Sequence, residues 1–316
     1  MTSTGLLSRL AESLFWIGRY VERADDTSRI VDAYLHRLLE DPFENEELAC
    51  RSLLAIMGLD PGDGPVTTAT VMELVAFNSD NPSAIVGSLH AAHENAQGTR
   101  DIMSSEMWEC LNTTWFEIPA RRSHGTRLGP HSFLRWVRER SSLFAGLADS
   151  TMSRSDAWRF VVLGRSLERV DMTARLMSVR VAAGGHAPNW PTLLRAAGAE
   201  EAFLSAYGGT QDPASIAEFL LRDRLFPRSA FHALLEAETC LAELNSGLSR
   251  SGISDPSQRI IGQMRTSLEY VDGATLLTNL ATILDSISES CAKASLAIGS
   301  TYFGSIHSIR WEAEEG

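Results

Sequence analysis

Two stretches of the sequence, 146 residues apart, place glutamate, aspartate and arginine in the same order. The first reads Gly18-Arg-Tyr-Val-Glu22-Arg23-Ala-Asp25-Asp-Thr27-Ser-Arg29-Ile30, and the second reads Gly164-Arg-Ser-Leu-Glu168-Arg169-Val-Asp171-Met-Thr173-Ala-Arg175-Leu176. Seven of the thirteen positions are identical. Groups of this kind can pair with one another, bind the carboxylate or amine of a substrate, or supply carboxylates to a metal ion. The repeated pattern therefore marks the first candidate site.

At helical spacing, the charged groups of each stretch fall on one narrow stripe that also contains the glycine. Apolar residues flank the stripe, among them Phe15 and Ile30 in the first copy and Met172 in the second. A glycine inside a helix costs about 1 kcal/mol relative to alanine, so Gly18 and Gly164 predict a close approach of another backbone or of a ligand. We therefore expect charges held between apolar surfaces, where an unpaired charge costs several kcal/mol.

These charged residues have three interpretations: a solvated helix face, a buried ion-pair lattice, or a ligand or metal site. The apolar flanks disfavour the solvated face. Two facing Glu-x-x-Asp pairs are similar to dimetal carboxylate bundles, but those use Glu-x-x-His, and neighbouring arginines repel a dication. We therefore expect no metal and no cofactor. The candidate lattice or substrate-binding residues are Arg19, Glu22, Arg23, Asp25, Arg29, Arg165, Glu168, Arg169, Asp171 and Arg175.

Helical periodicity dominates the rest of the chain, and strand signals are nearly absent. The pattern predicts an all-α bundle of eight to ten helices, with a polar segment at 118–129 and a loop at 183–191 that is too apolar to be a free linker. We expect a single domain over 1–316, with possible repeat halves at about 1–150 and 151–316. A pseudo-two-fold axis between the halves would make the two charged helices neighbours. The expected helices are 4–39, 45–57, 67–77, 81–111, 130–148, 153–182, 212–223, 227–248, 255–270 and 273–298.

Composition excludes several classes of protein. With 28 basic and 40 acidic residues the net charge is −12, which argues against nucleic acid or an anionic membrane surface as the partner. No apolar run approaches the roughly 20 residues that a membrane span needs, and the N-terminus has no signal-peptide pattern. Four widely spaced cysteines indicate reduced thiols and a cytoplasmic location. The sequence contains no phosphate-binding glycine loop and no G-x-S-x-G motif.

The opening segment, Leu7 to Thr27, resembles the α-E family, whose members begin L-x-R-x-A-E-x-x-F-W-x-G-R-Y-x-E-R-A-[ED]-x-T. The second charged stretch, the residues between Glu94 and Asn112, and Pro227-Arg228-Ser229 with Phe231 are also similar to family segments. The resemblance covers essentially the whole chain. It adds as secondary candidates Glu12, Trp16, Asn95, Arg100, Ser105, Glu106, Trp108 and Asn112.

The resemblance implies an all-helical domain that works with a circularly permuted ATP-grasp protein, which is encoded beside it or fused to it. A transglutaminase-like peptidase is often encoded nearby. This neighbourhood implies amide-bond formation or peptide modification, in which the partner supplies the ATP chemistry and this chain binds a peptide or amino-acid substrate or docks the ligase. Two alternatives stay open. One is a stand-alone enzyme acting on peptides or amino acids with Glu22 or Glu168 as base or metal ligand, and the other is a purely structural interaction module.

Overall fold

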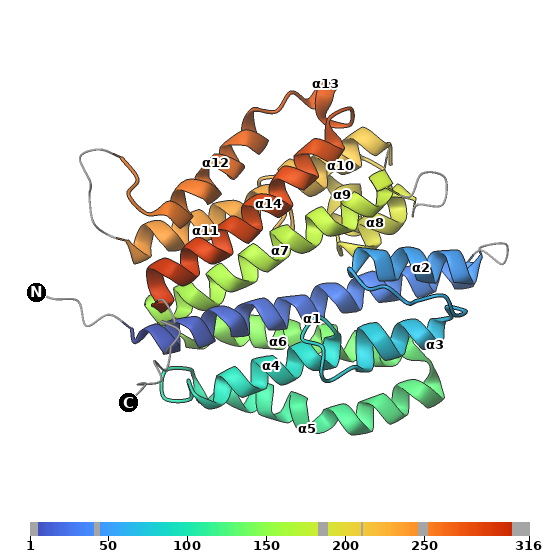
Figure 1. Cartoon of the computed structure of the whole chain (residues 1–316), viewed down its shortest axis with the longest axis horizontal. Coiled ribbons are helices and arrows are strands. Elements are labelled where there is room, and N and C mark those ends of the chain that lie inside the picture. The colour runs from blue at the N-terminus through green and yellow to red at the C-terminus, as the bar shows by residue number, and fades with distance from the viewer. Residues whose placement is uncertain (1–5, 41–44, 183–188, 210, 246–251, 305–316) are drawn as a thin grey trace, which may run out of the picture.

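Two long helices cross in the middle of the molecule (Figure 1): α1, Ser8–Glu40, and α7, Asp156–Ala182. The computed structural model describes residues 6–40, 45–182, 189–209, 211–245 and 252–304. Each long helix carries one of the two charged stretches, and each is buried on more than one side, because Leu14, Ile17, Leu163 and Leu167 are all inaccessible to solvent. The two helices pack against each other more extensively than any other pair.

Each long helix packs into its own group of four helices. Helix α1 contacts α4 and α6, which both contact α5, and helix α7 contacts α11 and α14, which both contact α12. In both groups, the long helix contacts the second and fourth helices along the chain, and the third helix contacts those two. The two charged helices are neighbours, as expected, and a duplication of the halves stays a prediction. The partner helices are α4 (Ile85–Gln97), α5 (Ser105–Leu128), α6 (Pro130–Thr151), α11 (Ala230–Leu244), α12 (Pro256–Tyr270) and α14 (Leu280–Ile298).

Shorter elements complete the molecule, and four of them contact α1, namely α2, α8 and two π-helical stretches. Several helices begin at a cap followed by proline, as at Asp212, whose Oδ1 accepts hydrogen bonds from the N–H groups of Ala214 and Ser215 at 3.0 Å. The short elements are α2 (Glu46–Ile56), α3 (Thr68–Val71), α8 (Trp190–Ala196), α9 (Glu200–Tyr207), α10 (Pro213–Arg222), α13 (Gly273–Leu276) and two π-helical stretches, Met72–Phe77 and Gly299–Phe303.

The described residues form helices and no strands, which confirms the all-α prediction. They contain fourteen α-helical segments, more than the eight to ten expected, because α8 and α9 lie where no helix was expected and the helices expected over 81–111 and 273–298 are each divided. No helix in this described portion is long and apolar enough to cross a membrane. Most of the predicted loop at 183–191 lies outside the described residues.

Two helix boundaries in the first half differ from the prediction. The helix expected over 81–111 is broken after Gln97, and a new helix begins after Ser104, whose hydroxyl caps the N–H of Met107. The polar segment at 118–129, expected to lie outside the helices, is helical, because α5 continues through Pro119 and ends only before Gly129, which has a φ of +94°. Proline removes one hydrogen bond from a helix, and here the burial of Ile118 against the core offsets that loss.

Candidate functional site

Helices α1 and α7 touch backbone to backbone at their glycines. A Cβ atom on Gly18 would lie 2.1 Å from the carbonyl oxygen of Val161, and one on Gly164 would lie 2.0 Å from the carbonyl oxygen of Phe15. The two contacts are reciprocal, because each glycine faces the residue that precedes the other glycine by three positions. The close approach predicted from the glycines is confirmed.

Next to the glycines, each helix supplies a glutamate to an arginine of the other helix. Arg169 donates from Nε and Nη2 to the two oxygens of Glu22, at 2.7 and 3.0 Å. Arg23 donates from the same two atoms to Glu168, at 2.5 and 3.0 Å. Arg19 adds a bond from Nε to Glu168 at 2.6 Å. Such two-pronged bonds are the strongest that an arginine and a carboxylate form.

The remaining terminal nitrogen of each crossing arginine is anchored on a proline carbonyl. Arg23 Nη1 donates to the carbonyl of Pro82 at 3.2 Å, and Arg169 Nη1 donates to that of Pro227 at 2.9 Å. Both prolines lie in the loops that precede α4 and α11. These bonds tie each four-helix group to the crossing and fix the direction of both guanidinium groups.

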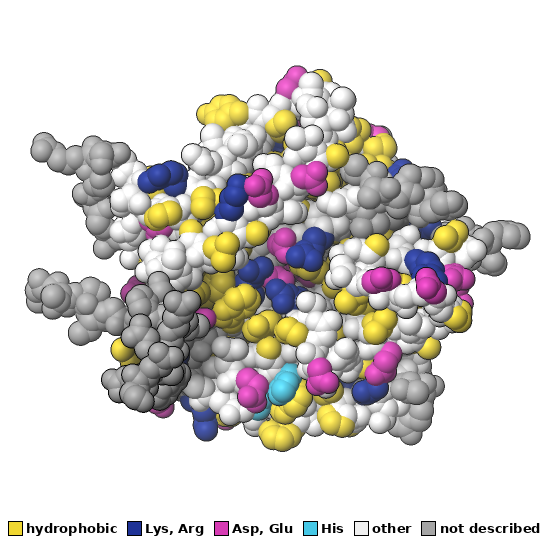
Figure 2. All heavy atoms as spheres, viewed as in Figure 1, with side chains coloured by type: hydrophobic (Ala, Val, Ile, Leu, Met, Phe, Trp, Pro, Cys, Tyr) yellow, Lys and Arg dark blue, Asp and Glu magenta, His cyan; other side chains and the backbone are white. Residues whose placement is uncertain are grey.

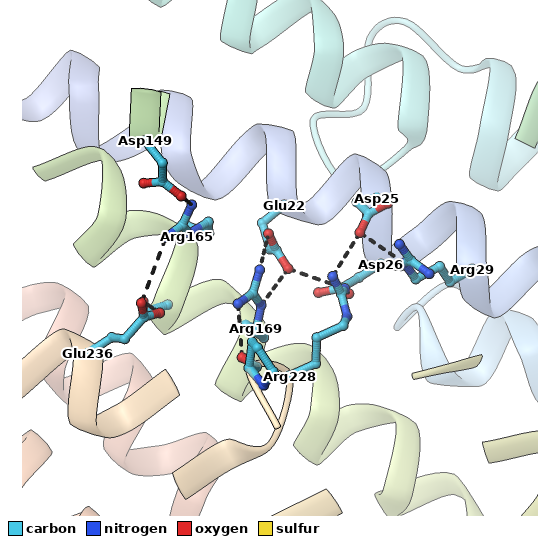
Figure 3. Close-up of polar contacts among 11 residues, drawn as sticks. Glu22, Asp25, Asp26, Arg29, Asp149, Arg165, Arg169, Arg228 and Glu236 are labelled. Carbon is cyan, nitrogen blue, oxygen red and sulfur yellow. Dashed lines mark hydrogen bonds and ion pairs between the residues drawn. The ribbon is translucent and has the colours of Figure 1, made fainter. Parts of the chain in front are cut away.

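The sequence analysis missed two members of this cluster, Asp26 and Arg228. Figure 3 shows the Arg228 side chain reaching from the loop before α11 towards Glu22, Asp25 and Asp26. Its guanidinium lies 3.2 Å from Glu22, donates to Asp25 at 2.9 Å, and donates to Asp26 through a short hydrogen bond. The family-like segment Pro227-Arg228-Ser229 was the available signal for it. We call the whole group the seam: Arg19, Glu22, Arg23, Asp25, Asp26, Glu168, Arg169 and Arg228.

Burial and arginine pairing shift the pKa values of the seam carboxyls in opposite directions. Burial alone would raise the pKa of Glu22, but Arg169 and Arg228 outweigh it and hold the pKa at about 2. The pKa of Glu168 is lowered against burial in the same way by Arg19 and Arg23. Burial raises the pKa of Asp26 to about 7, and the charges of Glu22 and Asp25 add to this against the effect of Arg228. The two glutamates are therefore held ionised, whereas Asp26 titrates near neutrality.

The seam has almost no internal space. A cavity of about 10 Å³ lies beside Asp26 and Arg228, and another of about 20 Å³ lies beside Gly18 and Ser141, so each is about the size of a single water molecule. Glu22, Asp25 and Asp26 are close enough to share a cation, but the Arg228 guanidinium already pairs with all three. This arrangement favours ion pairing over metal binding at the seam.

A group of residues beside Glu168 extends from the seam to the surface at Arg175. We call this group the rim: Trp16, Arg19, Tyr20, Arg23, Asp171 and Arg175. In the middle of the face drawn in Figure 2, basic and acidic side chains gather between α7 and α1, with hydrophobic side chains beside them. The Trp16 and Tyr20 rings stack at 5.4 Å, and Arg19 and Arg23 lie over them. Arg175 donates from Nε to Asp171 at 3.0 Å, with 48% of its side chain exposed.

The balance of guanidinium and carboxylate groups differs between the surroundings of Glu168 and those of Glu22. Within the described part of the chain, the ion pairs around Glu168 join three guanidinium groups, those of Arg19, Arg23 and Arg175, to two carboxylates, those of Glu168 and Asp171. Around Glu22, the three guanidinium groups of Arg29, Arg169 and Arg228 pair with three carboxylates. The group around Glu168 therefore has one more guanidinium group than carboxylates.

The other candidate residues lie apart from these pairs or at their margin. Arg165 points away from Glu22 and Glu168. It pairs instead with Asp149 at 3.4 Å and with Glu236 at 3.9 Å (Figure 3). Among the secondary candidates, Glu12 and Trp16 lie on α1 before the seam. The others lie on α4, on α5 or in the turn between them: Asn95, Arg100, Ser105, Glu106, Trp108 and Asn112.

Three of the secondary candidates, Arg100, Trp108 and Asn112, lie around His93. Trp108 stacks on His93 at 5.5 Å, Arg100 lies 4.5 Å over the Trp108 ring, and Asn112 lies 3.2 Å from His93 Nε2. Trp108 is half-buried within this stack. The structure thus groups these residues in a second cluster, and a functional role for either cluster stays a prediction.

The helical architecture and the Glu-Arg dipeptides agree with those of a known family. Residues 6–303 match the Alpha-E model, described as a predicted alpha-helical domain with a conserved ER motif. The chain belongs to the Alpha-E family. Two of its Glu-Arg dipeptides, at Glu22 and Glu168, are the ones that exchange partners across α1 and α7.

Comparison with curated proteins finds long mycobacterial relatives. The chain is similar to the uncharacterized protein Rv2567 of Mycobacterium tuberculosis and to the uncharacterized protein Mb2597 of Mycobacterium bovis, each 24% identical over 314 residues. These matches cover 88% of this chain but 35% of each relative, so the chain spans about a third of their length. No solved structure matches the chain.

The raised pKa of Asp26 predicts an unusual pH dependence of stability. An aspartate in the unfolded chain titrates near pH 4, so between about pH 4 and 7 the folded protein keeps a proton that the unfolded chain releases. The stabilisation from Asp26 is complete below that range and is lost as the pH rises through about 7. We expect Asp26→Asn, whose side chain cannot ionise, to gain stability relative to the wild type as the pH rises from about 4 to 7, and to keep that difference at higher pH.

Urea unfolding of both proteins at several pH values measures this difference. Asp80→Asn, a change at an exposed aspartate before α4, is the control and should show no such trend. A difference between wild type and Asp26→Asn that stays constant between about pH 4 and 7, or that moves in the opposite direction, contradicts the assignment. Glu22 has the opposite sign, because its lowered pKa stabilises the fold above about pH 4 and this contribution is lost as the pH falls towards 2.

Proposed function

We propose that this chain is the substrate-binding accessory component of an ATP-grasp-dependent system that forms amide bonds or modifies peptides. In this proposal a circularly permuted ATP-grasp protein supplies the ATP chemistry. The chain holds a peptide or amino-acid substrate by a carboxylate at the rim. The surplus guanidinium charge around Glu168, with Arg175 exposed beside Asp171, is the observation that carries the proposal.

The chemistry of the rim suits a carboxylate ligand. Guanidinium groups bind carboxylates through two parallel hydrogen bonds, and Arg175 is the most exposed of the three rim arginines. The stacked rings of Trp16 and Tyr20 offer an apolar surface next to these charges. Such a surface can pack against the side chain of a bound amino acid or peptide.

The lengths of the relatives support a partner protein. The chain matches about a third of each mycobacterial relative, so in those proteins the domain is joined to a much longer stretch of other sequence. A domain that acts together with another one is expected to occur both as a separate chain and as part of a fusion. The family resemblance supplies the identity of the partner, an ATP-grasp protein, as a proposal.

The seam itself supports a binding role over independent catalysis. A general base works best when its pKa lies near the working pH, whereas the pKa of Glu22 is about 2 and that of Glu168 is lowered. Both glutamates already accept bonds from two or more guanidinium nitrogens. The adjoining cavities are the size of a water molecule, which leaves no room for a peptide beside either glutamate.

A reconstituted assay tests the proposal. The chain is co-expressed with a circularly permuted ATP-grasp protein, the proposed partner, and the purified complex is assayed for ADP release with amino acids and short peptides. We expect Arg175→Gln to raise the KM for the carboxylate substrate about tenfold with kcat unchanged, because one charge-assisted hydrogen bond is lost. Arg121→Gln is the matched control, because Arg121 also pairs with a carboxylate one turn away and is 47% exposed.

The two parts of the proposal fail separately. If the two proteins do not form a complex and the chain does not change ADP release, the partnership is wrong. If the complex is active but Arg175→Gln behaves like Arg121→Gln, the rim is not where the substrate carboxylate binds.

A further inference from the structure

A second polar cluster lies where α1 meets the beginning of α6. It contains Asp32 and His36, one helical turn apart on α1, and His131 in the first turn of α6. One ligand atom from each of the three side chains lies within 4.8 Å of the other two. Asp32 is buried, His131 is half-buried and His36 is exposed, so the cluster extends from the protein interior to the solvent. Nothing in the proposed function uses these residues.

We propose that Asp32, His36 and His131 form a binding site for a divalent transition metal ion such as Zn²⁺. Two imidazole nitrogens and one carboxylate oxygen are ligands that zinc accepts, and three protein ligands leave a fourth position for water or a substrate atom. Zinc bonds of about 2.0–2.1 Å require ligand atoms roughly 3.3 Å apart. The ligand atoms of the three side chains lie within 4.8 Å of one another, which is close to this spacing.

The neighbours of Asp32 orient its carboxylate for this role. Arg138 donates to Oδ2 at 2.6 Å, and the other oxygen, Oδ1, lies 2.5 Å from Nδ1 of His131. A metal-binding carboxylate is commonly held in place by a hydrogen bond to its second oxygen, which is the position of Arg138 here. A bound metal ion would take the place of this direct contact between Oδ1 and Nδ1. The seam differs, because there the guanidinium of Arg228 contacts all three carboxylates.

The two histidines are already arranged as a pair. The rings of His36 and His131 lie 4.2 Å apart, centre to centre, with an angle of 33° between their planes. Rings held this close bring nitrogen atoms of both histidines within reach of one ion. Both ligands on α1 share one face of a rigid helix, and His131 follows Pro130 at the start of α6, so helix packing holds all three in place.

The cysteines do not compete for the ion in the folded protein. All four are buried as free thiols. Burial raises the pKa of Cys50 to about 11 and that of Cys240 to about 12, so neither supplies a thiolate at neutral pH. Burial also raises the pKa of Cys110 and Cys291.

Calorimetric titration of Zn²⁺ into the full chain, stripped with a chelator, tests this site. We expect saturable binding of one equivalent, and loss of at least tenfold in affinity in His36→Ala and in His131→Ala. His90→Ala is the matched control, because His90 is also a partly exposed histidine that faces a carboxylate one turn away, that of Glu94. Its affinity should equal that of the wild type. Substitution by Co²⁺ should produce visible absorption bands that both cluster variants lose.

Two results would overturn the proposal. One is the absence of saturable Zn²⁺ binding to the wild-type chain. The other is unchanged affinity in a His36→Ala/His131→Ala double variant whose circular dichroism matches that of the wild type. Because His36 is exposed, its removal leaves the core intact, and the His36→Ala result can be interpreted even if other cluster variants fold poorly.

Discussion

Glu168→Gln should lower the free energy of unfolding by about 3–5 kcal/mol, the usual cost of removing one partner from a buried ion pair. Glu168 is 1% exposed and receives hydrogen bonds from Arg19 and Arg23. A neutral amide leaves two mostly buried guanidinium groups without a compensating charge, although the side chain keeps its size. Urea unfolding at neutral pH measures the loss.

The control for this change is an exposed pair of the same types. Glu47 pairs with Arg51 one turn away, with 51% of the glutamate side chain exposed, and Glu47→Gln should cost no more than about 1 kcal/mol. If the two variants lose similar stability, the seam is hydrated and its charges do not depend on one another. If Glu168→Gln folds fully under stabilising conditions, it should still bind the partner, because its role is structural.

Gly18→Ala should be at least as damaging, with a loss of about 3 kcal/mol or more from overpacking. The new Cβ would lie 2.1 Å from the carbonyl oxygen of Val161, and a backbone atom cannot rotate out of the way as a flexible side chain can. The whole of α7 would have to move away from α1, which would lengthen the bonds between Glu22 and Arg169. Thermal and urea unfolding measure the loss.

Another helical glycine provides the control for the glycine experiment. Gly146 lies in α6, and a Cβ there meets nothing within 4 Å. Gly146→Ala should therefore stabilise the protein by about 0.5–1 kcal/mol, through reduced freedom of the unfolded chain. Gly164→Ala should match Gly18→Ala, and the double variant should lose less than the sum, because both changes separate the same two helices. A Gly18→Ala protein as stable as Gly146→Ala contradicts the observed crossing.

Sequence reasoning reached the crossing because its information is local. A glycine within each charged helical stripe predicts a close contact, and glutamate beside arginine between apolar flanks predicts buried pairing. Sequence did not determine which arginine meets which glutamate. Glu22 meets Arg169 and Glu168 meets Arg23, and this exchange depends on the angle at which α1 and α7 cross.

The residues that sequence missed are distant in the chain or lack a repeated position. Arg228 reaches Asp26 across 202 residues from a loop, so no periodicity connects them. Asp26 corresponds to Met172 in the second stretch, and the comparison of the two copies therefore passed over it. Asp32 and His131 are 99 residues apart in the sequence, and the contact of α6 with α1 brings them together.

The fold itself was largely predictable from periodicity and caps. The two errors in helix boundaries have different causes. Ser104 begins a helix in the middle of a stretch whose apolar spacing looks continuous. Pro119 reads as a helix breaker, yet the packing of α5 on α6 keeps the helix intact through it. The Ser104 cap is a local cause, whereas a tertiary contact decided the Pro119 case, and such a contact is not visible in a single window of sequence.

The exchange of partners at the crossing makes the two halves of the chain mutually dependent. Each Glu-Arg dipeptide is incomplete alone, because its acid neutralises the base of the other dipeptide and its base neutralises the other acid. A substitution in either dipeptide therefore disturbs both long helices. A substitution in one dipeptide is therefore expected to be tolerated only with a compensating change in the other. Natural selection is expected to act on the four residues as one inherited unit.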